Sequence, residues 1–487
     1  MIKISDSFKT DDKKLAALYE GAKSSLLGAV KPFGDYQLAV SDSDSDKITL
    51  ASEIMSAETL ARYDVEKALD CVKAFAMTQR EDGRLACEIF KDRGEIVCDY
   101  SRLADFCFAD EALSLFYMTK KKELSYLDML YNMFKRFDEY LSDTHDPNDN
   151  GLIELLDEKE AGEDELSARY TGLGNGAKGR SPFPVESGLM TAFSYGLKRS
   201  LAKISAIMGN GEALRYDTEA DELFEDIRGN FWDFEKGACY DRDRLGTHVT
   251  ALTLDNLFMM CHGAFDREMA DVFVKRHLLN PEEFYTDLPL AILPRNYSEF
   301  SNDELFRRNS PVRSVTYRRA IRALEKYGYY TELTELSKRF ISAVSESMAF
   351  TEHYDPITGA PSRKNICADY APTASAVLEM IARFYGISVV FDEIVWGALG
   401  HEGESTSEYS YKWGGDLFTL SSESNTSSAY VNGQHLFTVT NGVRVVTDWF
   451  GDKPKVINIT DKELDCVFVY RNQTFSFTLA PNRFMEF

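Results

Sequence analysis

Residues 372–396, PTASAVLEMIARFYGISVVFDEIVW, contain two different hydrophobic patterns. In the first part, apolar residues recur at three- and four-residue spacing, which predicts an amphipathic helix that ends near Gly386. From about residue 388, β-branched and aromatic residues follow one another closely, as is typical of strands. The chain is therefore expected to change from helical to β structure near residue 388.

The helical pattern extends through most of the preceding chain, from about residue 10 to 387. It recurs in residues 13–30, 57–77, 110–121, 125–141, 185–209, 219–231, 251–261, 267–279, 315–330 and 332–348. The long connections at 158–184 and 281–311 are rich in Gly, Pro, Asn and Asp, and such loops in a compact domain are usually functional. About a dozen paired helices with long loops suit an (α/α)6 toroid, although a bundle or a solenoid would show the same periodicity.

Short β-rich segments fill the chain after residue 388. DLFTLSS, HLFTVT, VRVVTDWF, KVINIT, DCVFVY and TFSFTLA each read as a strand, and Asn432-Gly433 and Asn441-Gly442 are strong hairpin signals. We therefore predict a mainly α protein with two domains. Residues 1–387 form the helical, catalytic-type domain, and residues 388–487 form an antiparallel, β-sandwich-like domain.

The composition limits the classes of partner. The chain has 487 residues, of which 44% are hydrophobic and 13% aromatic, enough for a full globular core. Its formal charge is 55 minus 79, or −24. Because so acidic a protein repels polyanions, neither nucleic acid nor a membrane surface is an expected partner.

The cysteines and the N-terminus indicate a reducing compartment. The cysteines are scattered and form no C-x-x-C pair, so neither a zinc site nor a dithiol centre is expected. The sequence MIKISDSFKTDDKK has no apolar signal core, and no apolar run reaches the length of a membrane span. We expect a soluble cytoplasmic protein without metal or other cofactor; the oligomeric state stays open.

Four loop segments, in their order along the chain, carry a resemblance to a known group of enzymes. They are TQREDGRL (78–85), HDPNDNGLIEL (145–155), RRNSPVRSVTYRRAIRALEKYGY (307–329) and TEHYDPITG (351–359). Together they resemble the loops of the (α/α)6-barrel, or six-hairpin, glycoside hydrolases of the trehalase and family 63 group, including mannosylglycerate hydrolase-like enzymes. The resemblance covers most of residues 60–385 and implies carbohydrate metabolism, with inverting hydrolysis of an α-glycosidic bond.

The last of these loops contains the expected general base. The group has an E-x-Y-x-P-x-T-G loop whose glutamate activates the attacking water, and the matching residue here is Glu352. Inverting hydrolysis also needs a second carboxyl group, about 6.5–9.5 Å from the first, to protonate the leaving oxygen. Taken alone, Glu352 would be read as a solvated acid at a helix end.

The second carboxyl group is missing from its usual place. Where the group has an aspartate in an S/T-G-x-D-N/D loop, this chain reads TGLGNG, with Gly174 at the acid's position. Either a nearby acid substitutes or the chain does not hydrolyse glycosides by this route. The candidates are Glu163, Asp164, Glu165 and Glu186, of which Asp164 and Glu186 are our preferred catalytic candidates. A solvated charge run explains the first three equally well, and a helix-dipole partner explains Glu186.

The resemblance also implies a set of substrate-binding residues. They are Gln79, Asn175, Asn309, Arg313 and Tyr354. Asn309 and Arg313 replace an arginine and a tryptophan that line the pocket in the group. Arg313, with Arg307 and Arg308, could hold a carboxylate or phosphate on the sugar, although surface arginines paired with acids would look the same. Tyr354 and Tyr170 are the rings expected to stack on the sugar.

Two readings remain beside the hydrolase. The chain could be a sugar-binding relative that has lost its acid, or an acidic scaffold protein. The turn from Asp146 to Asp157 also fits a calcium loop loosely, but the resemblance explains the same residues as a structural turn.

Overall fold

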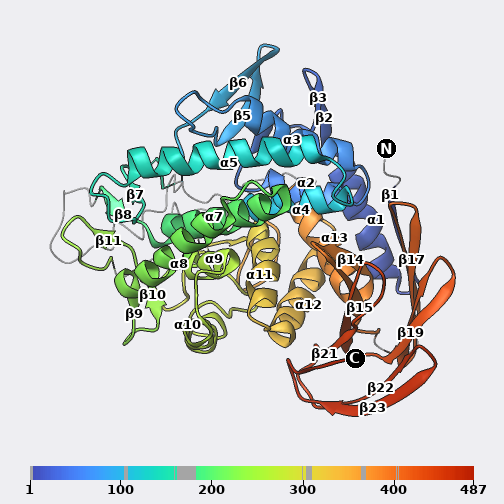
Figure 1. The fold of residues 1–487 in the computed structure, drawn as a ribbon. Helices are drawn as coiled ribbons and strands as arrows, with labels where there is room; N and C mark the ends of the chain where they lie inside the picture. The colour runs from blue at the N-terminus through green and yellow to red at the C-terminus, as the bar shows by residue number, and fades with distance from the viewer. Residues whose placement is uncertain are drawn as a thin grey trace.

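The computed structural model describes residues 4–103, 108–157, 159–161, 183–249, 251–298, 300–302, 310–362, 369–401, 403 and 405–487 (Figure 1). Its helices are α1 (Lys13–Gly28), α2 (Glu53–Leu60), α3 (Val65–Met77), α4 (Ala109–Met118), α5 (Leu124–His145), α7 (Gly188–Met208), α8 (Ala213–Asn230), α9 (Asp255–His262), α10 (Arg267–Phe273), the π-helical turn η1 (Val274–Leu278), α11 (Ser314–Lys326), α12 (Tyr330–Ser347) and α13 (Ala371–Tyr385). None of these helices is both long and apolar enough to cross a membrane.

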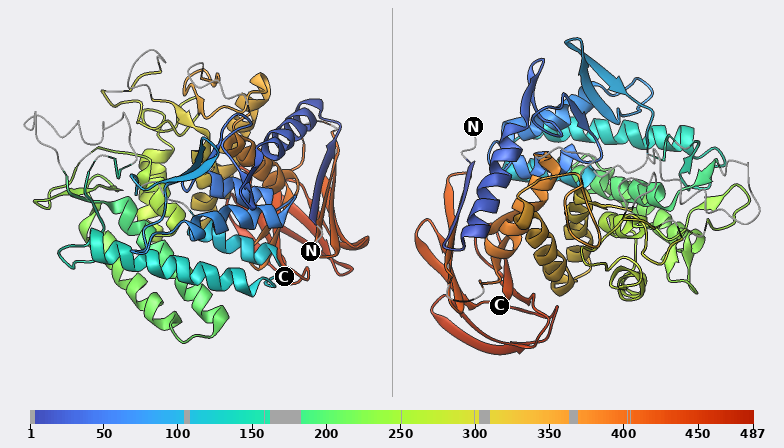
Figure 2. Two further views of the ribbon diagram at one scale, coloured as in Figure 1. Left: turned by 90° about the horizontal axis from the view of Figure 1, so that it is seen from above. Right: turned by 180° about the vertical axis from the view of Figure 1, so that it is seen from behind.

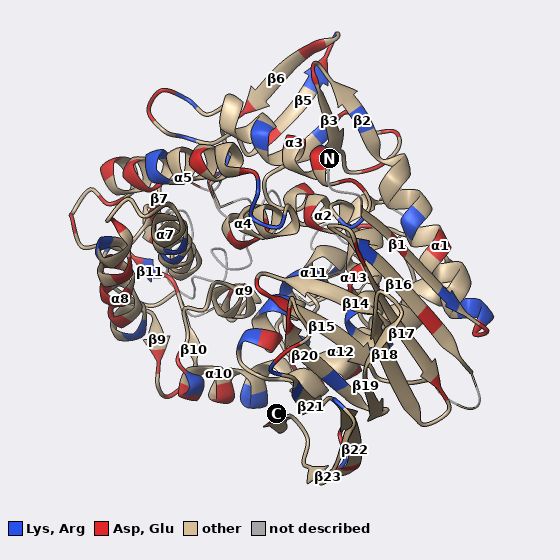
Figure 3. Ribbon diagram, turned by 45° about the vertical axis from the view of Figure 1, so that its right-hand side comes forward, with Lys and Arg blue, Asp and Glu red and all other residues tan. Residues whose placement is uncertain are grey.

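Buried and surface helices alternate along the chain. Most residues of α2, α4, α7, α9, α11 and α13 are inaccessible, and we call these the buried helices. Each packs on the next one, and α13 packs on α2, so the series of contacts returns to its start. The intervening surface helices cover them, and charged residues lie along α5, α8 and α10 (Figure 3). The alternation follows from the amphipathic patterns, because each surface helix has one apolar face to bury.

The buried helices begin at one end of the molecule. At the starts of α13 and α11, the Thr373 hydroxyl donates to the Ser314 hydroxyl (2.5 Å). The start of α13 also meets the loop before α2, because the Ala371 amide donates to the Ser41 carbonyl (2.7 Å). Phe258, in the first turn of α9, lies under the guanidinium of Arg319, in the second turn of α11. The loops that precede these helices therefore gather at this end.

The opposite end of the buried helices meets the β-rich part (Figures 1 and 2). One sheet has the order β1-β16-β17-β18-β19-β22-β23 and the other β14-β15-β20-β21-β24, and all their pairings are antiparallel. Their strands are β1 (Ile4–Thr10), β14 (Ile387–Val390), β15 (Glu393–Ala398), β16 (Ser407–Trp413), β17 (Asp416–Glu423), β18 (Thr426–Val431), β19 (Gln434–Thr440), β20 (Val443–Asp448), β21 (Lys455–Asn458), β22 (Leu464–Tyr470), β23 (Gln473–Leu479) and β24 (Phe484–Glu486). The predicted change from helix to strand is confirmed: α13 ends at Tyr385, and a side chain on Gly386 would collide with the Tyr409 ring.

The structure also differs from the predicted one. It is mixed helix and sheet rather than mainly α, because further strands lie among the helices: β2 (Val30–Phe33), β3 (Tyr36–Ala39), β4 (Lys47–Thr49), β5 (Glu88–Asp92), β6 (Glu95–Asp99), β7 (Glu154–Leu155), β8 (Val185–Glu186), β9 (Trp232–Asp233), β10 (Ala238–Cys239), β11 (Arg242–Asp243), β12 (Val312–Arg313) and β13 (His353–Tyr354). The helix predicted at 57–77 is two helices, since the Asp64 side chain caps α3. The domain division at 387/388 stays a prediction, and β1 pairs across it with β16.

Buried ion pairs connect the helical and β-rich parts. The Arg62 guanidinium, which is 4% exposed, lies 2.8 Å from the Asp6 carboxylate of β1 and donates to the Ile387 carbonyl at the start of β14. Arg62 Nη1 also lies 4.0 Å from the Glu379 carboxylate of α13. That carboxylate accepts a hydrogen bond from Arg383 Nε (2.8 Å). Burial alone would raise the pKa of Glu379, but Arg318, Arg383 and Arg62 lower it below the usual range. Arg62 thus joins the N-terminal strand, a buried helix and the β-rich part.

Arg62→Met should lower the free energy of unfolding by about 3–5 kcal/mol, because it leaves the Asp6 and Glu379 carboxylates buried without that cation. Urea unfolding followed by circular dichroism measures the change. Arg215→Met is the matched control, since that side chain is 49% exposed and should change stability by less than about 1 kcal/mol. Equal effects of the two variants would contradict a central role for Arg62.

Candidate active site

Backbone hydrogen bonds fix the loop that contains Glu352. β13 pairs with β12, and Arg313 is the cross-strand partner of His353. The Ser314 amide at the start of α11 donates to the Glu352 carbonyl (3.0 Å). The Glu352 side chain remains 39% exposed. A carboxylate is therefore presented, partly open to solvent, at the end where the buried helices begin.

Three further side chains, those of His353, Tyr370 and Arg313, form a group with Glu352. His353 Nε2 lies 3.8 Å from Glu352 Oε1. Tyr370, at the N-cap of α13, is buried; burial raises its pKa well above the usual range, and Glu53 and Glu352 add to the rise. Arg313 lowers the pKa of Tyr370 and that of His353, so its cation also lies in this group. The Arg313 Nε is buried and has no hydrogen-bond partner among the described residues.

Tyr370 and Glu53 were not predicted from the sequence. Glu53 is fully buried at the start of α2, and it accepts from the Thr49 amide (2.7 Å), the Ser52 hydroxyl (2.9 Å) and the Ser41 hydroxyl (3.0 Å). Burial raises the pKa of Glu53. The sequence signal for Tyr370 was its position just before the helix predicted from residue 372, whereas Glu53 lay outside the helix predicted at 57–77.

Two predicted substrate-binding residues, Tyr354 and Gln79, donate hydrogen bonds to backbone carbonyls. The Tyr354 ring is fully buried against Phe340, and its hydroxyl donates to the Ala349 carbonyl (2.6 Å). The Gln79 amide donates to the carbonyls of Gly83 (2.7 Å) and Met133 (3.0 Å), which ties the loop after α3 to α5. Tyr354 therefore holds the loop of Glu352, and its ring is not presented for stacking on a sugar.

Glu186 lies in the small sheet β7-β8-β11, two residues before α7. Its carboxylate is 3.3 Å from the Arg242 guanidinium and accepts from the Asn150 amide (2.9 Å). Glu154, its cross-strand neighbour, is 9% exposed. Burial raises the pKa of Glu154, and the charges of Glu186 and Asp146 raise it further. The sequence analysis missed Glu154 because only the pairing of β7 with β8 brings the two carboxyl groups together.

The remaining predicted site residues cannot be placed. Asp164, Asn175 and Asn309 lie outside the described residues, as do Glu163, Glu165, Tyr170, Gly174, Arg307 and Arg308.

The turn that begins at Asp146 is held by its own hydrogen bonds. The Asp146 carboxylate accepts from the amides of Asn150 and Gly151 (both 2.9 Å), and Gly151 has φ +79°. No group of three or more His, Cys, Asp or Glu side chains in the described part of the chain is arranged to hold a metal ion. These contacts are those of a structural turn.

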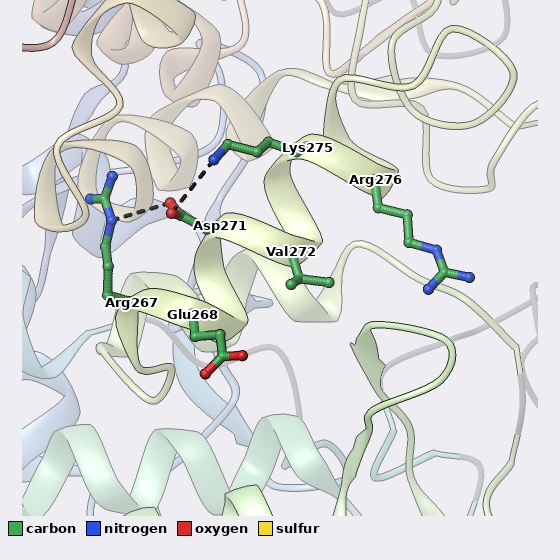
Figure 4. A pocket seen from close by; sticks show the side chains of 6 residues that line it. All are labelled: Arg267, Glu268, Asp271, Val272, Lys275 and Arg276. Atoms are coloured by element: carbon green, nitrogen blue, oxygen red, sulfur yellow. Dashed lines mark ion pairs between the residues drawn. The ribbon is translucent and has the colours of Figure 1, made fainter.

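Two hollows lie elsewhere among the described residues. A small cavity of about 10 Å³ lies between the starts of α7 and α9, next to Asp241, whose carboxylate accepts from the Gly188 amide (2.9 Å). A wider groove of about 660 Å³ lies on α10 and η1 (Figure 4). There Asp271 already pairs with Arg267 (3.1 Å) and Lys275 (3.5 Å). That groove is on a surface helix, away from the starts of the buried helices, so the candidate site is the group around Glu352.

Known structures share this fold. A mannosylglycerate hydrolase of family GH63 from Thermus thermophilus, solved with glucose, superposes with a TM-score of 0.61 at 15% identity, over 74% of this chain and 99% of that one. An α-L-rhamnosidase from Dictyoglumus thermophilum gives 0.55 at 13% identity, over 90% of this chain and 47% of that one. A protein described as a sialidase gives 0.67 at 13% identity, over 91% and 41%.

The family assignment comes from the sequence of the helical part. No curated protein matches the chain. Residues 51–371 match the mannosylglycerate hydrolase MGH1-like glycoside hydrolase domain. This match spans the buried helices from α2 to the start of α13, together with Glu352, Arg313 and Tyr370. The chain therefore belongs to the MGH1-like glycoside hydrolases.

Proposed function

We propose that this enzyme hydrolyses an α-glycosidic bond with inversion, and that Glu352 is the general base. The observation that carries the proposal is the position of Glu352: a partly exposed carboxylate, fixed by β13, beside Arg313 and Tyr370 at the starts of α11 and α13. The proposal includes an (α/α)6 toroid, which the closed series of contacts among the buried helices supports.

In this reaction Glu352 takes a proton from water, and the water oxygen attacks the anomeric carbon from the face opposite the leaving group. The glycosidic oxygen leaves with the bonding electron pair and takes a proton from a general acid. The hydroxyl delivered by the water then has the inverted configuration. This scheme requires the two carboxyl groups to stand about 6.5–9.5 Å apart, with room for the water.

The acid is proposed to come from the segment before α7. Asp164 and Glu186 stay candidates from the sequence, and Glu154 joins them. A general acid must hold its proton near neutral pH, and a carboxyl group does so when it is buried beside another carboxylate. Burial and Glu186 raise the pKa of Glu154, which is the direction that an acid needs, whereas Glu186 is paired with Arg242.

Arg313 is proposed to bind an anionic substituent of the substrate. Its Nε is a buried donor without a partner among the described residues, and an unsatisfied charged donor is costly unless a ligand completes it. A planar guanidinium matches a carboxylate in two parallel hydrogen bonds. A solved structure of the Thermus thermophilus enzyme contains Tris and D-glycerate, and glycerate is such a carboxylate.

Glu352→Gln should lower the rate on a glycosyl fluoride of the correct sugar by about 10²–10⁴-fold, because fluoride needs little help to leave and only the base is tested. Fluoride release measured with an ion-selective electrode gives the rate. Glu346→Gln, an exposed position on α12, is the control and should match the wild type. Equal rates for Glu352→Gln and the wild type would show that Glu352 is not the base.

The acid is identified by comparing leaving groups. Among Glu154→Gln, Glu186→Gln and Asp164→Asn, the variant that removes the acid should lose about 10²–10⁴-fold on an alkyl glycoside but little on the fluoride. Its pH profile should also lose the alkaline limb. If each of the three variants loses the same factor on the alkyl glycoside as on the fluoride, none of these residues donates the proton to the leaving oxygen. In that case Gly174→Asp should raise the rate of hydrolysis of the alkyl glycoside.

Arg313→Gln should raise KM about tenfold or more for a substrate that carries a carboxylate, since a hydrogen bond to a charged group contributes about 1.5–3 kcal/mol. Steady-state kinetics on the acidic substrate and on its neutral amide measures this. Arg313→Lys keeps the charge and loses the paired donors, so it should restore the affinity only in part. Equal losses on both substrates would mean that Arg313 does not bind the anion.

A further inference from the structure

His353 is a titratable neighbour of Glu352, and the reaction above gives it no role. Its Nε2 lies 3.8 Å from Glu352 Oε1, within ion-pair range but too long for a hydrogen bond. The imidazole is 19% exposed. The backbone carbonyl of His353 accepts hydrogen bonds from the Ser362 amide (2.9 Å) and the Thr351 hydroxyl (2.8 Å). The backbone that carries the ring therefore has little freedom to move.

Arg313 stands across the ribbon from His353. The two are in-register partners of β12 and β13, and such partners present their side chains on the same face of a sheet. His353 therefore has a cation at the position across the ribbon and a carboxylate at the preceding position of its own chain.

We propose that His353 is a positioning residue for Glu352: the neutral imidazole leaves the carboxylate free to accept a proton from water, and the imidazolium pairs with the carboxylate and withdraws it from the reaction. The proposal rests on the proposed role of Glu352 as the base. It involves no covalent step, since the only change at His353 is the gain or loss of one proton.

The groups around His353 determine at which pH its imidazole changes from neutral to protonated. Burial lowers the pKa of His353, Glu352 raises it and Arg313 lowers it, and the net pKa lies below its usual value. Glu352 and Arg313 are thus two charged groups of opposite effect on the ring. At neutral pH the imidazole is therefore uncharged. As the pH falls through the lowered pKa, the ring gains a proton and the pair with Glu352 forms.

The coupling can be measured without catalysis. The protein labelled with ¹³C-histidine gives one titrating ring signal per histidine, and His353→Gln identifies the signal of residue 353. We expect the pKa of His353 to fall in Glu352→Gln, which removes the attracting anion, and to rise in Arg313→Gln, which removes the repelling cation. A pKa that moves in neither variant would overturn the proposal.

The effect on the reaction is tested by the pH dependence of kcat/KM. In His353→Gln the acid limb should move to lower pH, and its limiting slope should change from about two to about one, because a single proton then inactivates the base. His435→Gln, an exposed position on β19, is the control and should leave the profile unchanged.

The outcomes separate this inference from the proposed function. A rate that drops equally at every pH in His353→Gln, with the limb unmoved, would assign the residue a purely structural role and overturn the inference alone. Full activity in Glu352→Gln would refute the base itself, and with it the role of His353, whatever the ring signal shows.

Discussion

The pairing of Arg62 with Asp6 and Glu379 is the constraint on which the rest of the architecture depends. One guanidinium meets a carboxylate from the N-terminal strand, a carboxylate from the last buried helix and a carbonyl at the start of the β-rich part. Since each charge is buried, none can be left alone without a desolvation cost of several kcal/mol. The N-terminal strand is therefore fixed to α13 and β14, although it lies hundreds of positions before them in the chain.

The candidate active site lies at the other end of the buried helices, away from these ion pairs. Near the end of α11, Glu325 pairs with Arg383 of α13 (3.1 Å) and with Arg444 of β20, which ties both helices to the β-rich part. At the opposite end lie the N-termini of these helices, and helix N-termini carry partial positive charge. In a chain with a net charge of −24, those ends and Arg313 offer an anion a locally favourable place.

Local patterns predicted much of this from the sequence. Periodicity found the helices and the change of structure at Gly386, and the E-x-Y-x-P-x-T-G loop pointed to Glu352, because these signals lie within one continuous stretch. Pairings between distant stretches could not be found in that way. The predicted helix at 57–77 hid the break at Arg62, whose partners are in β1 and α13. Glu154 and Tyr370 likewise owe their properties to neighbours from other segments.

The pairing of β1 with β16 also affects how the molecule is made. β1 leaves the ribosome before its partner Ser407–Trp413, which is synthesised on the order of tens of seconds later, at about 5–20 residues per second. Until then Arg62 has Asp6 but not Tyr409, and α1 has no α13 to cover it. The apolar face of α1 is therefore uncovered for most of the synthesis. The native contacts of β1 and α1 can form only after residues 371–413 have been made.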